Sequence, residues 1–272
     1  MAKYNGWRFG GGHTSNGSVG FGGGINGVPQ SIYSESENQK APLGTKLEFD
    51  DGRVFRYTNA AAAVAIANLC ANDYSAGLLA ETDNFTVGSD SVAGAYTLTL
   101  TGAGSEFATT ANAYAGSYII LSDGAGAGQY FRISDHKAAA SDKITFNLYD
   151  AIVTAPGSDT DIIIVGAPYG AVITCDGTSV GAATDSWPVG VAPIAITSGY
   201  YFWMQTKGIC AIDADYGTTA TPHYGQELVA SANHDGQVEA KTDALDGVRT
   251  IGYHVSPTGD DNTFISMYLD LE

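Results

Sequence analysis

The sequence predicts an all-β protein with one short helix, in which a β-barrel or β-sandwich body carries an added β domain and an extended glycine-rich N-terminal arm. Three observations lead to this prediction. Apolar and polar residues alternate over many short stretches, which is the period of a half-buried strand. Asp-Gly turn signals recur along the chain. Only residues 59–73 have the alanine-rich composition that favours a helix.

The first segment, residues 1–41, is predicted to be a docking arm. Ten of the first 30 residues are glycine, and ordering each backbone residue costs about 1–2 kcal/mol, most for glycine. We expect this arm to become ordered only against another surface, where each aromatic anchor contributes about 1.5–3 kcal/mol when buried. Its docking residues are Trp7, Arg8, Phe9 and Phe21. The alternative is a disordered terminus whose aromatic residues are incidental.

Residues 42–82 are predicted to form a hairpin followed by the short helix. In GTKLEFDDGRVFRY, apolar residues flank Asp50-Asp51-Gly52, so we expect a hairpin over residues 45–57. The next stretch, NAAAAVAIANLCAND, offers Asn59 as an N-cap and an alanine-rich run, although Val64 and Ile66 weaken it. We interpret this helix as a lid packed on a sheet rather than as a partner-binding surface.

Residues 83–168 are predicted to form the added β domain. The stretches AYTLTLTGAG and KITFNLYD alternate as half-buried strands do. SYIILSDGAGAGQYFRIS indicates two strands joined by a glycine-rich turn at 123–128, and DIIIVGAP indicates a strand that is apolar on both faces.

Residues 169–272 are predicted to form the C-terminal barrel-like domain. GYYFWMQTKGICAIDADYG is interpreted as a hairpin, with strands at 200–205 and 209–212 on either side of Lys207-Gly208. In FISMYLDLE, an apolar set alternates with Ser266, Tyr268 and Asp270, and we expect this strand to close a barrel or sandwich. The apolar set is Ile265, Met267, Leu269 and Leu271.

The charge balance excludes some partners. Twelve Lys and Arg stand against 29 Asp and Glu, a net charge of −17, which argues against a surface that neutralises nucleic-acid phosphates. The sequence shows no signal-peptide pattern that would predict secretion. It also shows no apolar stretch of the length of a membrane helix, so we expect no membrane partner. We therefore expect synthesis in a cytoplasm and three buried, reduced thiols, at Cys70, Cys175 and Cys210.

Residues that carry chemistry do not combine into a predicted site. An enzyme needs a nucleophile with a base, a carboxylate pair or a ligand cluster, and we find none of these patterns in the sequence. The glycine-rich loops lack the phosphate-loop pattern, and the acidic turns lack the calcium-loop pattern. The histidines have no ligand spacing; they are His13, His136, His223, His234 and His254. The prediction is a protein that is not an enzyme, with no catalytic residue, metal or cofactor.

The aromatic run Tyr200, Tyr201, Phe202 and Trp203 is the strongest binding feature of the body. Its side chains alternate between the two faces of a strand, which favours a core or an oligomer interface over a ligand platform. We predict an oligomer interface here. The alternative is a stacking platform for a host glycan, made of Trp187, Tyr200, Tyr201 and Trp203.

Two stretches resemble structural proteins of tailed bacteriophages. PLGTKLEFDDGRVFRYTNAAA resembles the opening of many virion proteins, and GVAPIAITSGYYFWMQTKGICAI followed by GQELVASANHDGQV is similar to the small β-barrel of capsid decoration, or cement, proteins. The resemblance covers roughly residues 42–80 and 190–238. Residues 83–168 depart from the smallest decoration proteins. The resemblance implies a homotrimer that binds the major capsid protein on the capsid exterior and stabilises the shell after assembly in the host cytoplasm. The alternative is a tail or receptor-binding protein that recognises a host glycan.

Overall fold

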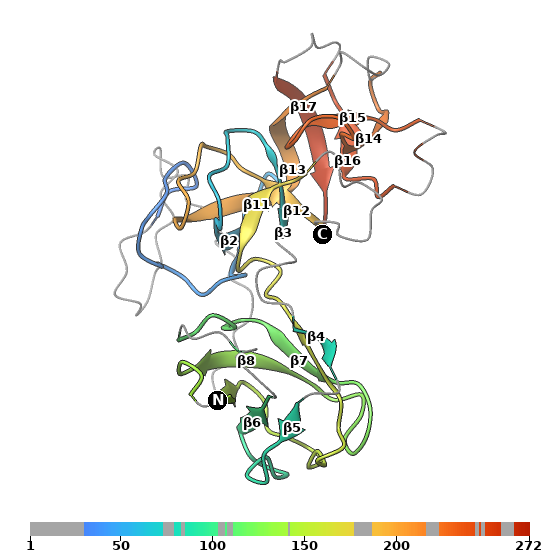
Figure 1. Ribbon diagram of the computed structural model, residues 1–272. Coiled ribbons are helices and arrows are strands. Elements are labelled where there is room, and N and C mark those ends of the chain that lie inside the picture. The colour runs from blue at the N-terminus through green and yellow to red at the C-terminus, as the bar shows by residue number, and fades with distance from the viewer. Residues whose placement is uncertain are drawn as a thin grey trace. The chain divides into compact units, whose positions relative to one another are not determined.

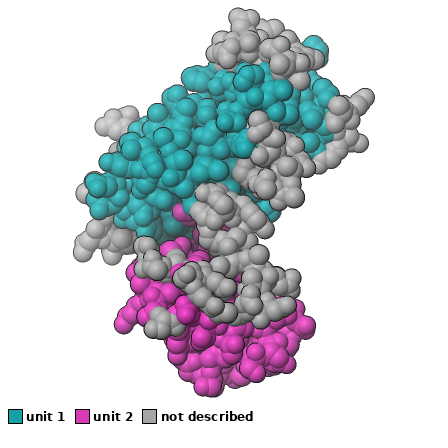
Figure 2. All heavy atoms as spheres, in the orientation of Figure 1, with its two compact units in different colours: residues 1–73, 171–272 teal, residues 74–170 magenta. Residues whose placement is uncertain are grey.

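The computed structural model is all-β throughout its described part (Figure 1). It describes residues 30–72, 79–82, 85–102, 107, 111–140, 142–176, 187–215, 223–242, 245, 248–256 and 264–272. Within these residues there is no α-helix, so no described helix is long and apolar enough to cross a membrane. The chain divides into two compact units, residues 1–73 with 171–272 and residues 74–170, which Figure 2 colours separately.

Unit 1 contains a ten-stranded sheet made from both ends of the chain. Its strands are β1 (Lys46–Glu48), β2 (Val54–Asn59), β3 (Leu69–Asn72), β11 (Val172–Thr174), β12 (Trp187–Val191), β13 (Tyr201–Asp213), β14 (Glu227–Ala230), β15 (Val238–Ala240), β16 (Gly252–His254) and β17 (Phe264–Asp270). The main order is β11-β3-β12-β13-β17-β16-β14-β15, and β2 joins β1 to β13. A bridge between Ala214 and Val238 links the end of β13 to β15, so the sheet curls into a half-barrel or sandwich.

The predicted hairpin over residues 45–57 is confirmed. Strands β1 and β2 pair antiparallel, with Leu47 opposite Phe55. The turn between them needs a residue at positive φ, and Gly52 supplies it with φ of 84°. The backbone N–H of Gly52 donates to the carbonyl of Phe49, which closes the turn.

The predicted helix is wrong, because the backbone of this segment forms most of its hydrogen bonds with distant parts of the chain. Val64 exchanges backbone hydrogen bonds with Ile196 in both directions, and the N–H of Ala67 donates to the carbonyl of Ala192. Val64 and Ala67 are buried, at 2% and 3% exposure, and Ala67 has φ of 61°, which a right-handed helix does not allow. Tertiary pairing therefore overrides the helix propensity of alanine.

The predicted hairpin at 200–212 is also wrong, because β13 is one continuous strand. Its first half pairs with β2 and its second half with β17, and Lys207 has a register partner in each, Val54 and Asp270. Gly208 has φ of 89° next to a register shift in the β2 pairing, so it marks an irregularity within the strand and not a turn. The side-chain amide of Gln205 donates to the carbonyls of Lys207 and Ile209, which holds this irregular segment in place.

The last strand, β17, has the predicted alternation. Ile265, Met267 and Leu269 are buried, whereas Ser266 and Tyr268 face outward. The buried set belongs to a core that also takes side chains from β3, β12, β13, β14, β15 and the segment before β16. This core fills the inside of the half-barrel.

Unit 2 contains a seven-stranded antiparallel sheet in the order β4-β10-β7-β8-β9-β6-β5. Its strands are β4 (Leu79–Thr82), β5 (Thr86–Val87), β6 (Thr97–Thr101), β7 (Tyr118–Leu121), β8 (Tyr130–His136), β9 (Lys143–Leu148) and β10 (Ile162–Val165). The predicted β7–β8 hairpin is present, with Ile119 opposite Phe131. The predicted alternation in β9 buries Ile144, Phe146 and Leu148 in the core of this unit.

The unit boundaries group the chain differently from the four predicted segments. Unit 2 contains the predicted added domain, residues 83–168. Residues 42–73 and 171–272, however, share one sheet instead of forming separate domains. Unit 2 is inserted between β3 and β11, which pair with each other, with Asn72 opposite Val172.

Candidate functional site

The docking residues predicted in the arm, Trp7, Arg8, Phe9 and Phe21, lie outside the described residues. The end of the predicted arm is different, because residues 30–41 are part of the body. Ile32 is 2% exposed and packs in an aromatic cluster with Phe55, Tyr57 and Trp203. An arm that docks elsewhere can therefore include at most residues 1–29.

A buried polar network fixes the point where this segment begins. The hydroxyl of Tyr57 donates to Gln30 Oε1 at 2.8 Å, and the amide of Gln30 donates to the carbonyls of Ser34 and Tyr201 at 2.9 and 2.8 Å. The N–H of Lys40 donates to the Tyr57 hydroxyl at 2.9 Å. Burial raises the pKa of Tyr57 to about 12, so the phenol stays protonated and can donate. Sequence reasoning missed Gln30, because a single glutamine gives no pattern.

The aromatic run is divided between the core and the surface. Phe202 and Trp203 are 0% and 1% exposed, so both lie in the core of their own chain and are unavailable to a second copy. Tyr200 and Tyr201 remain half-buried, and Tyr201 stacks on Tyr57 with ring centroids 6.1 Å apart. The prediction of an oligomer interface at this run therefore fails for Phe202 and Trp203.

The predicted glycan platform does not assemble from its four residues. Trp187 is 65% exposed, and the guanidinium of Arg249 lies over its ring at 5.2 Å. Tyr201 packs against Tyr57 instead, and Trp203 is buried. Of this set, only Trp187 presents most of its side chain to solvent.

The three cysteines are free thiols, as predicted, with Cys70 and Cys175 buried and Cys210 partly buried. Burial raises the pKa of Cys70 well above its usual value and raises the pKa of Cys210 to about 12. Because the thiolate is the reactive form, both thiols are inert near neutral pH.

One serine lies within hydrogen-bond distance of a histidine ring, at His254 and Ser256. His254 Nε2 is 2.9 Å from the Ser256 hydroxyl, which is the spacing of a nucleophile and its base. However, His254 is 0% exposed and its Nδ1 has no partner among the described residues. A proton on Nε2, donated to Ser256, avoids an unpaired buried N–H. In that state the ring donates to the serine and cannot accept its proton.

A second Ser-His-Asp group lies at the turn between β14 and β15. Ser231 donates to Asp215 Oδ2 at 2.9 Å, and His234 Nδ1 lies 3.1 Å from the same oxygen. In a catalytic triad the histidine stands between serine and aspartate, whereas here the aspartate stands between the other two. Ser231 also accepts the N–H groups of Asn233 and His234, so the group fixes the turn.

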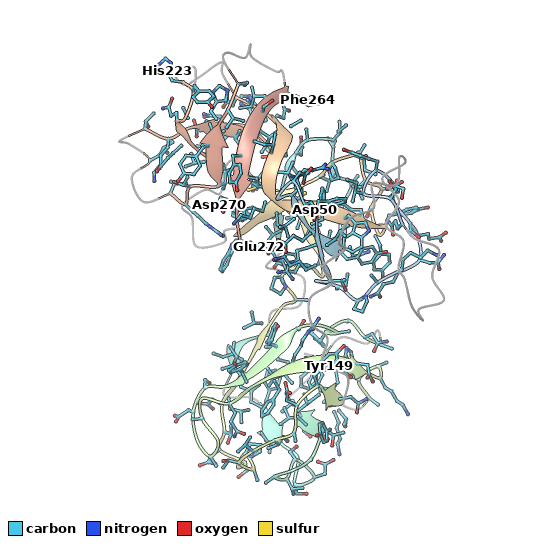
Figure 3. All side chains as sticks on the ribbon, turned by 180° about the vertical axis from the view of Figure 1, so that it is seen from behind. Asp50, Tyr149, His223, Phe264, Asp270 and Glu272 are labelled. Carbon is cyan, nitrogen blue, oxygen red and sulfur yellow. The ribbon has the colours of Figure 1, made fainter. Side chains whose placement is uncertain are left out.

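The remaining histidines do not form a ligand set in the described part of the chain. The ring of His136 is buried and its Nε2 accepts the N–H of Tyr114 at 2.9 Å. His223 lies at a chain turn (Figure 3), and His13 is outside the described residues. Across the described residues, no group of three His, Cys, Asp or Glu is placed to hold a metal ion.

A bidentate ion pair joins β2 to the segment after β17. The guanidinium of Arg56 donates to both carboxylate oxygens of Glu272, at 2.6 and 3.0 Å, and to the carbonyl of Gly44 at 2.9 Å. Thr206 donates to Glu272 Oε1 at 3.0 Å. Burial acts to raise the pKa of Glu272, but the hydrogen bond and charge of Arg56 outweigh it and lower the pKa. This arrangement stabilises the sheet and offers no open coordination position.

Comparisons of the chain with protein-family models, curated proteins and solved structures found no match.

Proposed function

We propose that the protein is a structural protein of a tailed-bacteriophage virion that binds the capsid shell as a decoration protein. The observation that carries this proposal is that the two phage-like stretches, which are distant in sequence, fold into one sheet. Phe55, Arg56 and Tyr57 of the first stretch pair with Gln205, Met204 and Trp203 of the second. The resemblance therefore applies to a single folded unit and not to two unrelated fragments.

The proposed partners are the major capsid protein and further copies of the chain on the capsid exterior. The composition supports this role, because the net charge of −17 disfavours adhesion to the packaged nucleic acid. The proposal assigns the protein no enzymatic step.

The arm has a defined place in this proposal. Gln30, the first described residue, is anchored to Tyr57 and Tyr201, so the described body begins at a fixed point. Residues 1–34 hold Lys3 and Arg8 and no acidic residue, which suits an acidic neighbour. We propose that the arm docks on the capsid or on a neighbouring copy.

Deleting residues 2–24 tests the arm. Because the described body begins at Gln30, thermal unfolding should stay nearly unchanged, while binding to shells that lack the protein should weaken at least tenfold. The matched control replaces the same residues by a Gly-Ser linker of equal length, which keeps the length but removes the aromatic anchors. Binding of either variant with full-length affinity would refute the docking arm.

The second candidate is a tail or receptor-binding protein that recognises a host glycan, and the exposed Trp187 favours it. An aromatic ring that is 65% exposed is suited to stacking on a sugar ring, although the Arg249 guanidinium already lies over the Trp187 ring. Two measurements distinguish the candidates: the copy number per virion from quantitative mass spectrometry, and the position of the protein from immunogold labelling. Hundreds of copies over the head support decoration, and a handful at the tail supports the alternative. Absence from purified virions would refute both.

A further inference from the structure

The Asp-Gly steps of the chain are not equivalent in the structure. Three of them lie entirely within the described residues, at 51–52, 123–124 and 235–236. Each of the three glycines has a positive φ, of 84°, 71° and 74°, so each step belongs to a turn or bend. The steps differ in the group that accepts the hydrogen bond of the glycine N–H.

At two of these steps a backbone carbonyl accepts the glycine N–H. The N–H of Gly52 donates to the carbonyl of Phe49 at 3.0 Å. The N–H of Gly236 donates to the carbonyl of Cys175 at 2.8 Å, and Gly236 is itself buried. In both cases the amide nitrogen is therefore held by a backbone partner.

The step at Asp123-Gly124 is different, because its amide faces the side chain next to it. The N–H of Gly124 donates to Asp123 Oδ1 at 2.7 Å, and the described residues offer it no other acceptor. Both residues are exposed, and no Lys, Arg or His in the described ranges forms an ion pair with Asp123. The carboxyl group can also rotate, because the χ2 torsion of aspartate is soft.

We propose that Asp123 is a site of spontaneous isoaspartate formation. In this reaction the backbone nitrogen of the next residue attacks the side-chain carboxyl carbon, so the two groups must lie in contact before they react. The 2.7 Å contact with Oδ1 places the Gly124 nitrogen beside the Asp123 carboxyl group. Glycine favours the attack further, because it has no Cβ to hinder the approach.

The reaction is an isomerisation that needs only water. The Gly124 nitrogen forms a bond to Asp123 Cγ and gives up its proton, while the C–O bond of the protonated carboxyl group breaks and its oxygen leaves as water. Water then adds to one of the two carbonyl carbons of the resulting succinimide ring. Cleavage of the new bond restores aspartate, whereas cleavage of the original peptide bond leaves the chain connected through Cγ, as isoaspartate.

The product changes the turn between β7 and β8, because isoaspartate adds one methylene carbon to the main chain. This turn packs closely on the segment before β10. A Cβ on Gly124 would lie 2.8 Å from the carbonyl oxygen of Asp159, and the hydroxyl of Thr160 donates to the carbonyl of Ala125 at 2.9 Å. A longer main chain cannot keep both contacts unchanged. Isoaspartate at position 123 should therefore loosen this turn locally.

Ageing of the folded, full-length chain at about 37 °C and neutral pH tests the inference. Peptide mapping with electron-transfer fragmentation distinguishes isoaspartate from aspartate, and it should find at least tenfold more isoaspartate at position 123 than at Asp51 or Asp235. Water enriched in the heavy oxygen isotope should label position 123, because ring opening incorporates one oxygen atom from water. Asp123→Glu keeps the charge but moves the carboxyl carbon away from the nitrogen, so it should abolish the product there.

The matched control is the same chain denatured in guanidinium chloride, which keeps the three Asp-Gly sequences and removes their folded geometry. In the denatured chain the three positions should react at similar rates. Equal amounts of isoaspartate at the three positions of the folded chain overturn the inference. An unmodified Asp123 in the folded chain, under conditions in which the denatured chain reacts, also overturns it. None of these outcomes depends on binding to a capsid, which tests the proposed function separately.

Discussion

Replacing Glu272 by Gln should destabilise unit 1 by about 2 kcal/mol at pH 7. The side chains of Arg56 and Glu272 are 25% and 19% exposed, which places the pair between surface ion pairs, worth about 0–1 kcal/mol, and buried pairs, whose disruption costs about 3–5 kcal/mol. Two charge-assisted hydrogen bonds, at 2.6 and 3.0 Å, support a value in the middle of this range. Urea unfolding measures the change, and the melting temperature should fall by about 2–4 °C for each kcal/mol.

The pH dependence of this effect has a definite sign. The pKa of Glu272 is lowered from 4.5 in the folded chain, so its stabilising contribution is complete above pH 4.5 and is lost as the pH falls through the folded value. The difference between wild type and Glu272→Gln should therefore shrink in acid. Glu48→Gln is the control, because the pair of Glu48 with Lys46 is 40% and 37% exposed and should contribute less than about 0.5 kcal/mol. Equal effects of the two substitutions, or a difference that persists unchanged at pH 3, would refute the reasoning.

Two further substitutions test the interior of unit 1. Gly208→Ala should lower the free energy of unfolding in urea by about 2–4 kcal/mol, because φ is +89° and a Cβ would lie 3.0 Å from the Cα of Arg53. Gly199→Ala is the matched control, because φ is +81° but no atom lies within 4 Å of its Cβ position. It should lower the free energy of unfolding only by the conformational strain, about 1–2 kcal/mol. At pH 8, Cys210 should resist alkylation until the chain is denatured, because burial raises its pKa to about 12.

Local signals predicted those elements whose partners are close in sequence. The turn at Gly52 joins β1 to β2, and the glycine-rich segment 123–128 joins β7 to β8, so turn chemistry and alternation are sufficient there. The alternation in β17 also identified its buried side, because one face of that strand is solvated. Period-two patterns are informative wherever one face of a sheet meets water.

The wrong predictions depend on partners that are distant in sequence. The alanine-rich segment resembles a helix until Val64 is known to bond to Ile196. Lys207-Gly208 resembles a turn until both β2 and β17 are known to pair with β13. The aromatic run resembles an interface until residues 30–43 are known to pack against the cluster that contains Trp203. In each case, the sequence shows the propensity of a segment but not the distant residues that pair with it or pack against it.

The site of the insertion explains how one chain can combine the ten-stranded body with an added domain. Strand β3 ends at Asn72 and β11 begins at Val172, and these residues are opposite each other in an antiparallel pair. A short turn would be enough to join two such strands. The insertion therefore takes the place of a hairpin loop, where extra residues interrupt no hydrogen bond of the ten-stranded sheet. Unit 2 can consequently change its own surface without any change in the pairing that positions Arg56, Glu272 and Gln30.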